Sequence, residues 1–367
     1  MKILFVINVD FSLRHFLLPL MRAARARGHD VLAACAPGAM LAGARAEGFQ
    51  VVEIPFSRRL APWAHVRALL ALVALMKAEK PGLVHAHMPI SGFLARLAAR
   101  IAYVPRVAVT SHGFLFNQPG FPPRRAMAFV AEWLAGRWTD IFLTVSREEA
   151  RDARRLGIAR APGVVGNGRD PDVFHPDPSA RARLRAALGV PDDRVVVITV
   201  ARLVRHKGFP ELAAAMRAVS GAELWVVGDR LPSDRGPDMA AALRAAGLGA
   251  RLRLLGMRDD VPALLAAADI FVLASHFEGL PMSVIEAMLS CLPVVACDIK
   301  GVREMVRDGT TGLLVPPGNG PALAAALSRL IEAPALRATM GEAGRLRAVR
   351  DYGQAVVLAH TLDALGL

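Results

Sequence analysis

Two carboxylates, Glu278 and Glu286, lie in the stretch of this chain that is richest in candidate chemistry. The apolar run over residues 268–274 predicts a buried strand, and Gly279 and Pro281 after it predict a turn, with Pro281 at the first position of a helix. Both carboxylates can then face one crevice, Glu278 from the loop and Glu286 from about one turn into the helix. Because an ionised carboxylate only accepts hydrogen bonds, the pair is suited to hydroxyl groups such as the diols of a ribose and a hexose.

The predicted helix start offers a place for an anionic group. A strand, a loop and a helix in this order put free backbone N–H groups and the positive end of the helix at the carboxyl edge of a parallel sheet. We therefore predict that phosphates of the ligand bind to the loop and the first helical turn. The residues expected there are Gly279, Leu280, Pro281, Ser283 and Val284.

Arg202 and Lys207 are the candidate cations for the same ligand. Arg202 follows the predicted strand 194–200, and Lys207 precedes Gly208 at the start of a predicted helix. In these positions they bracket the place where a diphosphate would rest, and they can offset the charge that grows on a departing nucleotide. We predict a catalytic and a binding role for both residues.

The spacing of the two acids, Glu-x7-Glu, and its context, Glu-Gly-Leu-Pro-x4-Glu-Ala-Met, resemble the motif of the retaining GT-B glycosyltransferases of family 4. Arg202 and Lys207 are similar to the Arg…Lys-Gly pair that this family uses on the donor pyrophosphate. The resemblance spans essentially the whole chain, and it is strong in residues 195–316. It implies an α/β fold of GT-B type, in which two Rossmann-like, doubly wound parallel-sheet domains face each other across a cleft. It also implies a UDP-sugar site with Glu278 as a catalytic and Glu286 as a donor-binding residue.

Other loops are expected to complete donor binding through their backbones. Gly228 ends a predicted strand, and Met257 and Arg258 lie in a segment that resembles the family's loop beside the uracil. We expect backbone contacts at Met257 and Arg258 to bind the base. The types of their side chains are therefore a weak guide to which base is bound. The resemblance favours uridine over guanosine.

Two histidines of the first half are candidates for the sugar side of the site. His112 follows a predicted strand and precedes Gly113, and the resemblance implies a position near the transferred sugar, where we assign it a catalytic role. The alternative is that His112 caps the strand end through backbone bonds. His85 and His87 are separated by one residue in another predicted strand, and no carboxylate or cysteine joins them at metal spacing. No metal site is therefore predicted, and His87 is assigned to the acceptor side.

The loop after the first predicted strand departs from the pattern of many relatives. Where they carry a glycine-rich loop, this chain has Asn8-Val9-Asp10-Phe11. The lack of a Gly-x-Gly-x-x-Gly sequence argues against an NAD(P)-dependent dehydrogenase. The opening resembles a subset of bacterial polysaccharide and glycolipid transferases, and we expect Asp10 to face the acceptor.

The length and the patterning predict two α/β domains. At 367 residues the chain is long for a single core, and helical Ala/Leu/Arg segments alternate with short Val/Ile-rich runs, which is typical of repeated βαβ units. Turn residues accumulate over 164–176, so a boundary is predicted after residue 176. The predicted domains are residues 1–176 on the acceptor side and residues 177–349 for the nucleotide sugar. The resemblance implies that the tail, residues 350–367, returns to the first domain.

The net charge of +13 is concentrated in the first half of the chain and predicts an anionic partner, either a membrane surface or a phosphorylated acceptor. No nucleic-acid-binding module is recognised, so nucleic acid is not an expected partner. Segments 57–67 and 121–133 mix Arg pairs with Trp or Phe. They are typical either of helices that lie on a bilayer surface or of ordinary amphipathic helices.

The expected location is the cytoplasm, with peripheral attachment to the inner face of the plasma membrane. Cys35, Cys291 and Cys297 show neither metal nor disulfide spacing, and the first residues resemble a strand rather than a signal peptide. The longest candidate for a membrane span, residues 68–76, is far below the roughly 20 residues required.

The predicted reaction is a retaining transfer of a sugar from a UDP-sugar to a hydroxyl of a lipid-linked or cell-envelope glycan. Without an Asp-x-Asp motif of clear metal role, the cations and the helix start are expected to neutralise UDP without a metal or another cofactor. No carboxylate is an evident nucleophile, so we expect front-face attack, with the leaving phosphate as the proton acceptor. The alternatives are a GT-B epimerase or hydrolase of sugar nucleotides, and a scaffold subunit that binds a nucleotide sugar without turnover.

Overall fold

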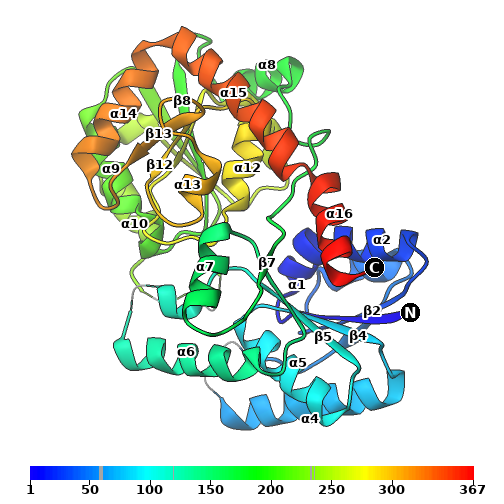
Figure 1. Cartoon of the computed structure of the whole chain (residues 1–367). Helices are drawn as coiled ribbons and strands as arrows, with labels where there is room; N and C mark the ends of the chain where they lie inside the picture. The colour runs from blue at the N-terminus through cyan, green and yellow to red at the C-terminus, as the bar shows by residue number, and fades with distance from the viewer. Residues whose placement is uncertain (58–60, 119, 232–233, 235) are drawn as a thin grey trace. The chain divides into compact units, whose positions relative to one another are not determined.

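The computed structural model describes residues 1–57, 61–118, 120–231, 234 and 236–367, and its contacts group them into two units (Figure 1). Met1–Gly166 and Leu358–Leu367 form the first unit, and residues Asn167–Val357 form the second. Residues 58–60, near the start of the predicted membrane-surface segment 57–67, lie outside the described residues.

A seven-stranded sheet forms the centre of the first unit, and its strands pair in parallel in the order β3-β2-β1-β4-β5-β6-β7. The chain starts in the middle of this order, winds to one edge and then builds the other, so the winding direction switches between β1 and β4. Open α/β sheets bind ligands at such a switch point, outside the carboxyl ends of the strands. The strands are β1 (Lys2–Val6), β2 (Asp30–Cys35), β3 (Gln50–Glu53), β4 (Leu83–His87), β5 (Arg106–Ser111), β6 (Ile141–Thr144) and β7 (Gly163–Val164).

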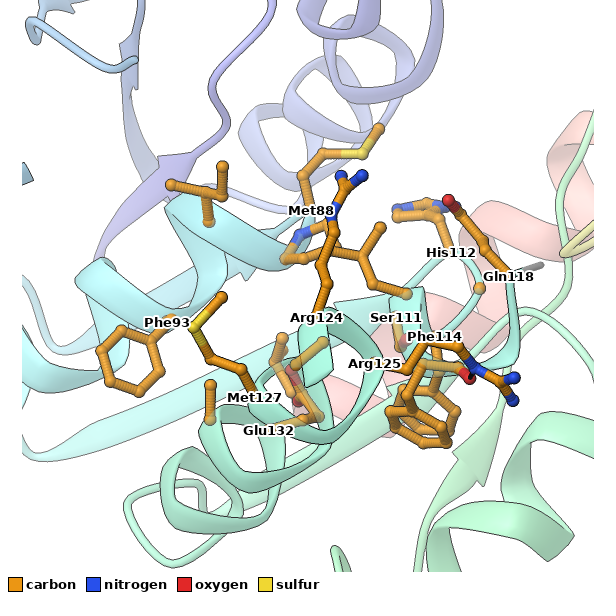
Figure 2. A pocket seen from close by; sticks show the side chains of 18 of the residues that line it. Met88, Phe93, Ser111, His112, Phe114, Gln118, Arg124, Arg125, Met127 and Glu132 are labelled. Carbon is orange, nitrogen blue, oxygen red and sulfur yellow. Dashed lines mark hydrogen bonds between the residues drawn. The ribbon is translucent and has the colours of Figure 1, made fainter. Parts of the chain in front are cut away.

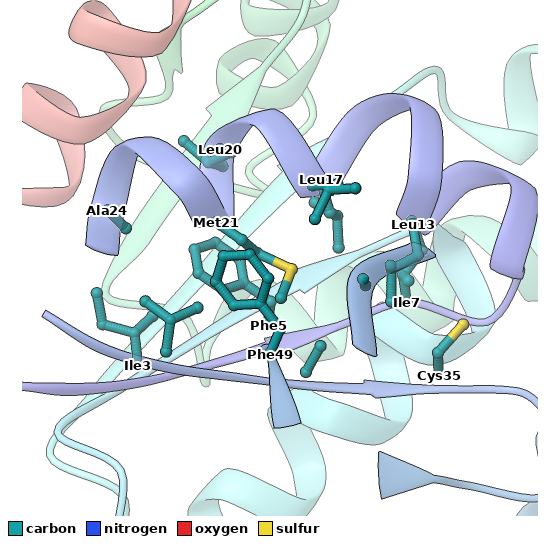
Figure 3. Packing of buried hydrophobic residues seen from close by; sticks show 14 of the residues in the cluster. Ile3, Phe5, Ile7, Leu13, Leu17, Leu20, Met21, Ala24, Cys35 and Phe49 are labelled. Carbon is teal, nitrogen blue, oxygen red and sulfur yellow. The ribbon is translucent and has the colours of Figure 1, made fainter. Parts of the chain in front are cut away.

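Helices cover both faces of this sheet because its strands are apolar on both sides. Along β1, Ile3 and Phe5 belong to one buried cluster and Leu4 and Val6 to another, as a period of two requires. Figure 3 shows the first cluster, in which Met21 of α2 (Leu18–Ala26) packs close to Phe5. The other helices of this unit are α1 (Asp10–Ser12), η1 (Leu13–Leu17), α3 (Leu41–Ala46), α4 (Pro62–Glu79), α5 (Pro89–Ile101), η2 (Leu115–Asn117), α6 (Pro122–Gly136) and α7 (Arg147–Arg155).

The last helix of the chain, α16 (Gln354–Leu365), contributes to the same first cluster. Leu362 and Leu365 are buried in that cluster, and Arg106 of β5 donates a hydrogen bond to Leu365 O at 2.6 Å. Residues from Leu358 onward thus belong to the first unit. The predicted tail begins at residue 350, whereas by contacts residues 350–357 group with the second unit.

The second unit has a six-stranded parallel sheet in the order β10-β9-β8-β11-β12-β13, and here the winding direction switches between β8 and β11. Its strands are β8 (Val195–Val200), β9 (Ala222–Val227), β10 (Leu252–Gly256), β11 (Ile270–Leu273), β12 (Val294–Cys297) and β13 (Gly312–Val315). Its helices are α8 (Pro178–Ala187), η3 (Arg205–Lys207), α9 (Phe209–Ala218), α10 (Met239–Arg244), η4 (Gly249–Arg251), α11 (Val261–Ala267), α12 (Met282–Leu289), α13 (Val302–Met305), α14 (Gly320–Glu332) and α15 (Pro334–Tyr352).

The turn-rich segment at the end of the predicted first domain, residues 164–176, belongs mostly to the second unit. Arg169 donates its N–H to Tyr352 O at 3.0 Å and accepts from Gln354 N at 2.8 Å. The division between the units falls after Gly166, ten residues before the predicted boundary. Turn residues here indicate irregular backbone that is hydrogen-bonded into a domain rather than a connection between domains.

None of the helices in the described part of the chain is long and apolar enough to cross a membrane.

Candidate active site

The predicted site residues of the second unit lie on loops that leave neighbouring strands. Phe271 of β11 pairs in register with Ile198 of β8, so both strands end at the same edge of the sheet, at its switch point. The loop after β8 carries Arg202 and, in η3, Lys207. The loop after β11 carries Glu278 and leads into α12.

Lys207 and Glu278 form an ion pair between these two loops. Lys207 Nζ lies 2.5 Å from Glu278 Oε1, and the two side chains are only 15% and 10% exposed. Charge-assisted hydrogen bonds of this kind strengthen as water is excluded. The structure thus brings together two residues that the sequence placed in separate motifs.

Two backbone features fix the loops next to this pair. His276 donates its N–H to His206 O at 2.9 Å. Gly208 has a φ of +74°, and a Cβ at this position would lie 1.9 Å from Ala274 O. Only glycine fits both the dihedral angle and the close approach, which explains the glycine after Lys207.

Arg202 binds Asp234, a residue that the sequence analysis did not single out. Its Nη1 lies 2.5 Å from Asp234 Oδ1, and Asp234 Oδ2 accepts from Leu231 N at 2.9 Å. The carboxylate is 7% exposed and the arginine side chain 40% exposed. Since guanidinium carries five N–H donors, Arg202 can bind Asp234 and still present donors to a phosphate.

Glu286, on α12, is buried and bound to Arg169. Arg169 Nε donates to Glu286 Oε1 at 2.6 Å, and nearby Asn167 Nδ2 donates to Leu280 O at 2.8 Å. Both donors come from the turn-rich segment 164–176, which the sequence analysis assigned to the end of the first domain. The sequence signal that could have identified these donors was the presence of an amide and a cation, Asn167 and Arg169, in an otherwise turn-forming run.

The loop before α12 is packed against the loop after β12. Gly301 has a φ of +78°, and a Cβ there would lie 1.7 Å from Gly279 O and 3.4 Å from Leu280 N. The predicted phosphate loop therefore rests directly on the backbone at residue 301.

Pro281 is the N-cap of α12, not its first residue as predicted. Its ψ of 120° is extended, so the helix starts at Met282. The N–H of Val284 donates to Pro281 O at 3.2 Å and is engaged within the first turn. Since the first N–H groups of a helix lack acceptors inside the helix, those of Met282 and Ser283 are the ones oriented for an anion.

The predicted base-binding residues lie at the ends of β9 and β10. Gly228 donates its N–H to Gly256 O at 2.8 Å, and a Cβ at Gly228 would lie 2.2 Å from Ala201 O. Met257 is exposed, and Arg258 is bound through two hydrogen bonds to Asp260, at 2.7 and 2.6 Å. The Arg258 guanidinium is thus engaged locally, and a backbone contact with the base stays a prediction.

In the first unit, His85, His87 and His112 form a buried cluster at the ends of β4 and β5. The rings of His85 and His87 lie 4.2 Å apart, and His87 Nδ1 lies 3.1 Å from His112 Nε2. Burial lowers the pKa of His85 to about 3 and of His112 to about 4, and it lowers the pKa of His87 well below its usual range. His112 is therefore neutral at pH 7 and can only hydrogen-bond to a ligand, not supply charge.

Glu149, also missed by the sequence analysis, holds the loop that carries His112. Its Oε1 accepts from Ser111 Oγ at 2.6 Å and from Gly113 N at 2.9 Å, on both sides of the histidine. Burial raises the pKa of Glu149 to about 7 despite these two hydrogen bonds. The Ser-x-x-Glu pattern from Ser146 indicates a helix start, and Ser146 Oγ does accept a hydrogen bond from Glu149 N. The pattern does not reveal which groups the Glu149 carboxylate binds.

Asp10, predicted on the acceptor side, is engaged by backbone groups. Its carboxylate accepts from Phe11 N at 2.8 Å and from Met40 N at 3.2 Å. A Cβ at Gly38 would lie 2.0 Å from Asp10 Oδ2, so the carboxylate packs against the loop after β2. This geometry supports a role in joining two loops, and contact with an acceptor stays a prediction.

No group of three or more His, Cys, Asp or Glu side chains in the described part of the chain could hold a metal ion. Cys35, Cys291 and Cys297 are free thiols.

Two doubly wound parallel sheets of this kind define the GT-B fold. The crystal structure of Anabaena Alr3699/HepE in complex with UDP-glucose is similar to the chain, with a TM-score of 0.86 and 25% identity, covering 100% of this chain and 99% of that chain. The model of the family "Glycosyl transferases group 1" matches residues 180–347, and that of "Glycosyltransferase Family 4" matches residues 15–173.

Curated relatives agree with these matches. "Putative glycosyltransferase EpsD" of Bacillus subtilis (strain 168) is 31% identical over 361 residues, covering 95% of this chain and 92% of that protein. An Escherichia coli protein named UDP-Gal:alpha-D-GlcNAc-diphosphoundecaprenol alpha-1,3-galactosyltransferase is 31% identical over 262 residues, covering 68% of this chain and 66% of that protein. The chain belongs to glycosyltransferase family 4 and is a glycosyltransferase of GT-B type.

Proposed function

We propose that this glycosyltransferase transfers a sugar from a UDP-sugar to a hydroxyl of a lipid-linked cell-envelope glycan, with retention of the anomeric configuration. The observation that carries the proposal is the Lys207–Glu278 ion pair at the switch point of the second unit, beside the start of α12. It supports the proposal because Lys207 can serve as a cation for the diphosphate and Glu278 as an acceptor for sugar hydroxyls, on loops next to the helix start, whose first N–H groups can bind an anion. The relatives' names support the donor, since one names UDP-galactose and one similar structure holds UDP-glucose.

The proposed mechanism is a front-face displacement. The bond between the anomeric carbon and the phosphate oxygen breaks, and the acceptor oxygen forms a bond on the same face of the sugar. The acceptor's proton passes to the departing phosphate oxygen. Arg202, Lys207 and the N–H groups at the start of α12 stabilise the charge that develops on UDP, which is why the proposal requires neither a metal nor another cofactor.

A lipid-linked acceptor is proposed from the surface of the first unit. Large apolar side chains are exposed on α4 and α6, among them Trp63 and Val130, and Phe121 is exposed just before α6. Together with the arginines of the same segments, they fit attachment to an anionic bilayer. A relative's name supports this acceptor class, since it includes a diphosphoundecaprenol-linked sugar.

The test incubates the purified protein with a panel of UDP- and GDP-sugars and membrane lipid extract, with and without EDTA. We expect acceptor-dependent UDP release, a glycolipid mass gain of one sugar, a retained configuration by NMR, and full activity in EDTA. Glu278→Ala should abolish the mass gain. A product of inverted configuration would overturn the mechanism, and sugar release or epimerisation without any acceptor would indicate a hydrolase or an epimerase instead.

A further inference from the structure

A cavity of about 340 Å³ lies in the first unit between α5, the end of β5 and α6 (Figure 2). Its volume is close to the lower end of the range for small-molecule pockets, and its lining is mostly apolar, with a few polar groups. His112, the residue assigned to the sugar side of the reaction, is part of the lining. None of the donor-binding residues contributes to it, so the donor site leaves this cavity unexplained.

The lining changes in character from one side of the cavity to the other. In Figure 2, Phe93 and Met127 lie on one side, and His112 and Gln118 lie on the opposite side. The side chain of Arg124 extends between the two groups in this view. A ligand that fills the cavity could therefore contact Phe93 and Met127 at one side, and the Arg124 guanidinium and the His112 imidazole towards the other.

The charges of the cavity leave a net positive potential. Among the described residues of the lining, the one acid is Glu132, and it is paired with Arg96, whose Nη1 and Nη2 lie 2.8 and 3.0 Å from its two carboxylate oxygens. Arg124 and Arg125 add two further cations, and Arg125 Nε donates to Phe116 O at 2.8 Å. The lining thus suits an apolar chain with an anionic group at its end.

We propose that this cavity binds the acceptor's lipid, with the start of a prenyl or alkyl chain between Phe93 and Met127 and its linking phosphate at Arg124. The remainder of a long chain would continue over the exposed side chains of Met127 and Phe121. Identification of the occupant as the acceptor rests on the proposed function. The affinity of the cavity for a lipid phosphate does not rest on the proposed function, and it can be measured without turnover.

The binding test uses isothermal titration of the full chain with dodecyl phosphate, dodecyl maltoside and inorganic phosphate, each below its micellar concentration where it has one. Dodecyl phosphate should bind at least about tenfold more tightly than dodecyl maltoside, and inorganic phosphate should not bind measurably. Equal affinity for the two dodecyl compounds would overturn the phosphate position, and binding of inorganic phosphate alone would overturn the chain position.

Two matched variants of α6 locate the site. Met127→Trp fills the cavity and should weaken dodecyl phosphate binding about tenfold or more, whereas Leu134→Trp adds a similar bulk at an exposed position of the same helix, outside the lining and outside segment 121–133, and should not. Arg124→Gln should remove the preference for phosphate over maltoside. Equal loss, or no loss, in both tryptophan variants would overturn the assignment to this cavity, provided that their thermal unfolding matches that of the native chain.

Failure of this inference can be told apart from failure of the proposed function. If the protein binds dodecyl phosphate but transfers no sugar to any lipid, the cavity assignment stands and the function fails. If it transfers sugar but Met127→Trp raises KM equally for dodecyl-linked and methyl-linked acceptor phosphates, the function stands and the cavity assignment fails. UDP affinity, which reports on the second unit, should be the same in all three variants.

Discussion

Arg169 Nε lies 2.6 Å from Glu286 Oε1, although the two residues are 117 positions apart in the sequence. The arginine comes from the first residues of the second unit and the glutamate from α12. A carboxylate recognises a particular hydroxyl only when its orientation is fixed, and Arg169 is the side chain that fixes it here. The turn-rich segment 164–176 is therefore expected to support the proposed donor site.

Arg169→Met is expected to weaken UDP-sugar binding to nearly the same degree as Glu286→Gln, by about tenfold each. Because the two residues act as a unit, the double variant should lose little more than either single one. Calorimetric titration with the UDP-sugar measures all three affinities. Arg350→Met is the control, since Arg350 is an exposed arginine that pairs only with its neighbour Asp351 among the interactions described, and it should leave affinity unchanged. Fully additive losses would contradict the coupling.

Lys207→Met is expected to cost stability as well as rate. It leaves the carboxylate of Glu278, which is 10% exposed, without its cation, and the loss should be about 2–3 kcal/mol, below the range for a fully buried pair. Lys207→Met with Glu278→Gln should recover part of that stability but none of the activity. Urea denaturation gives the free energies, and a kcat reduced by about 10²–10³ in each variant is the kinetic expectation.

Gly301→Ala is expected to weaken UDP binding by displacing the phosphate loop, because the new Cβ would lie 1.7 Å from Gly279 O. Gly318→Ala provides a matched control. Its φ of +76° is almost equal to the +78° of Gly301, but a Cβ at that position meets nothing within 4 Å. Both variants should lose a similar amount of stability from backbone strain, and only Gly301→Ala should lose UDP affinity. Equal UDP affinities would show that the contact does not position the loop.

The buried histidines should make the first unit less stable in acid. Their pKa values fall from 6.5 to about 4 for His112 and about 3 for His85, so the unfolded chain binds more protons below pH 6.5. Stability is therefore lost as the pH falls from about 6.5 towards 4. Glu149 opposes this trend, because its pKa rises from 4.5 to about 7 and its contribution is lost as the pH rises through that window.

Glu149→Gln tests this balance, since glutamine can accept the same hydrogen bonds but does not titrate. The gain in stability between pH 5 and pH 7 should be larger in the variant than in the native chain, by roughly 1–3 kcal/mol. Urea midpoints at pH 5, 6 and 7 measure it. Parallel pH profiles for the two proteins would mean that Glu149 is already ionised throughout this range.

The proposed membrane contact predicts that Trp63→Gln combined with Phe121→Gln reduces binding to anionic vesicles by about tenfold, because both side chains are large, apolar and exposed. Leu346→Gln is the control, since Leu346 is similarly exposed but lies on α15 of the second unit. Vesicle co-sedimentation at low and high salt gives the comparison. A similar loss of vesicle binding in the double variant and in Leu346→Gln would indicate nonspecific hydrophobic adsorption rather than a membrane-binding surface.

Local patterns are sufficient to predict most of the fold. The sequence pattern predicts a strand over residues 30–35 and a helix over 62–79, and these match β2 and α4, because each combines a clear period with flanking Pro, Gly or polar residues. The same pattern predicts one helix over about 13–27, but the chain forms α1, the π-helix η1 and α2 in succession. A hydrophobic period of 3.6 residues does not reveal that one turn within the helix is a wider π-helical turn. β7, with two residues, is too short to leave a pattern.

The residues of the candidate site likewise fall into those that the sequence could predict and those that it could not. Glu278, Arg202 and Lys207 lie in loops whose residue types and spacing identify them. Their partners could not be found from the sequence, because Asp234 and Arg169 are chosen by tertiary packing and not by spacing. Motifs indicate which groups meet the ligand, whereas the side chains that hold those groups in place follow only from the folded chain.

The path of α16 affects the order in which the protein can fold during synthesis. Leu362 and Leu365 belong to the core cluster that contains Ile3 and Phe5 of β1, so the first unit can close only after the ribosome has added residues through Leu365. The second unit is continuous in sequence and has all its residues by Val357. Domains usually mature from the N-terminus onward. In this chain, the first unit begins to be made before the second but is completed after it, and until then the apolar side chains that pack against Leu362 and Leu365 lack that cover.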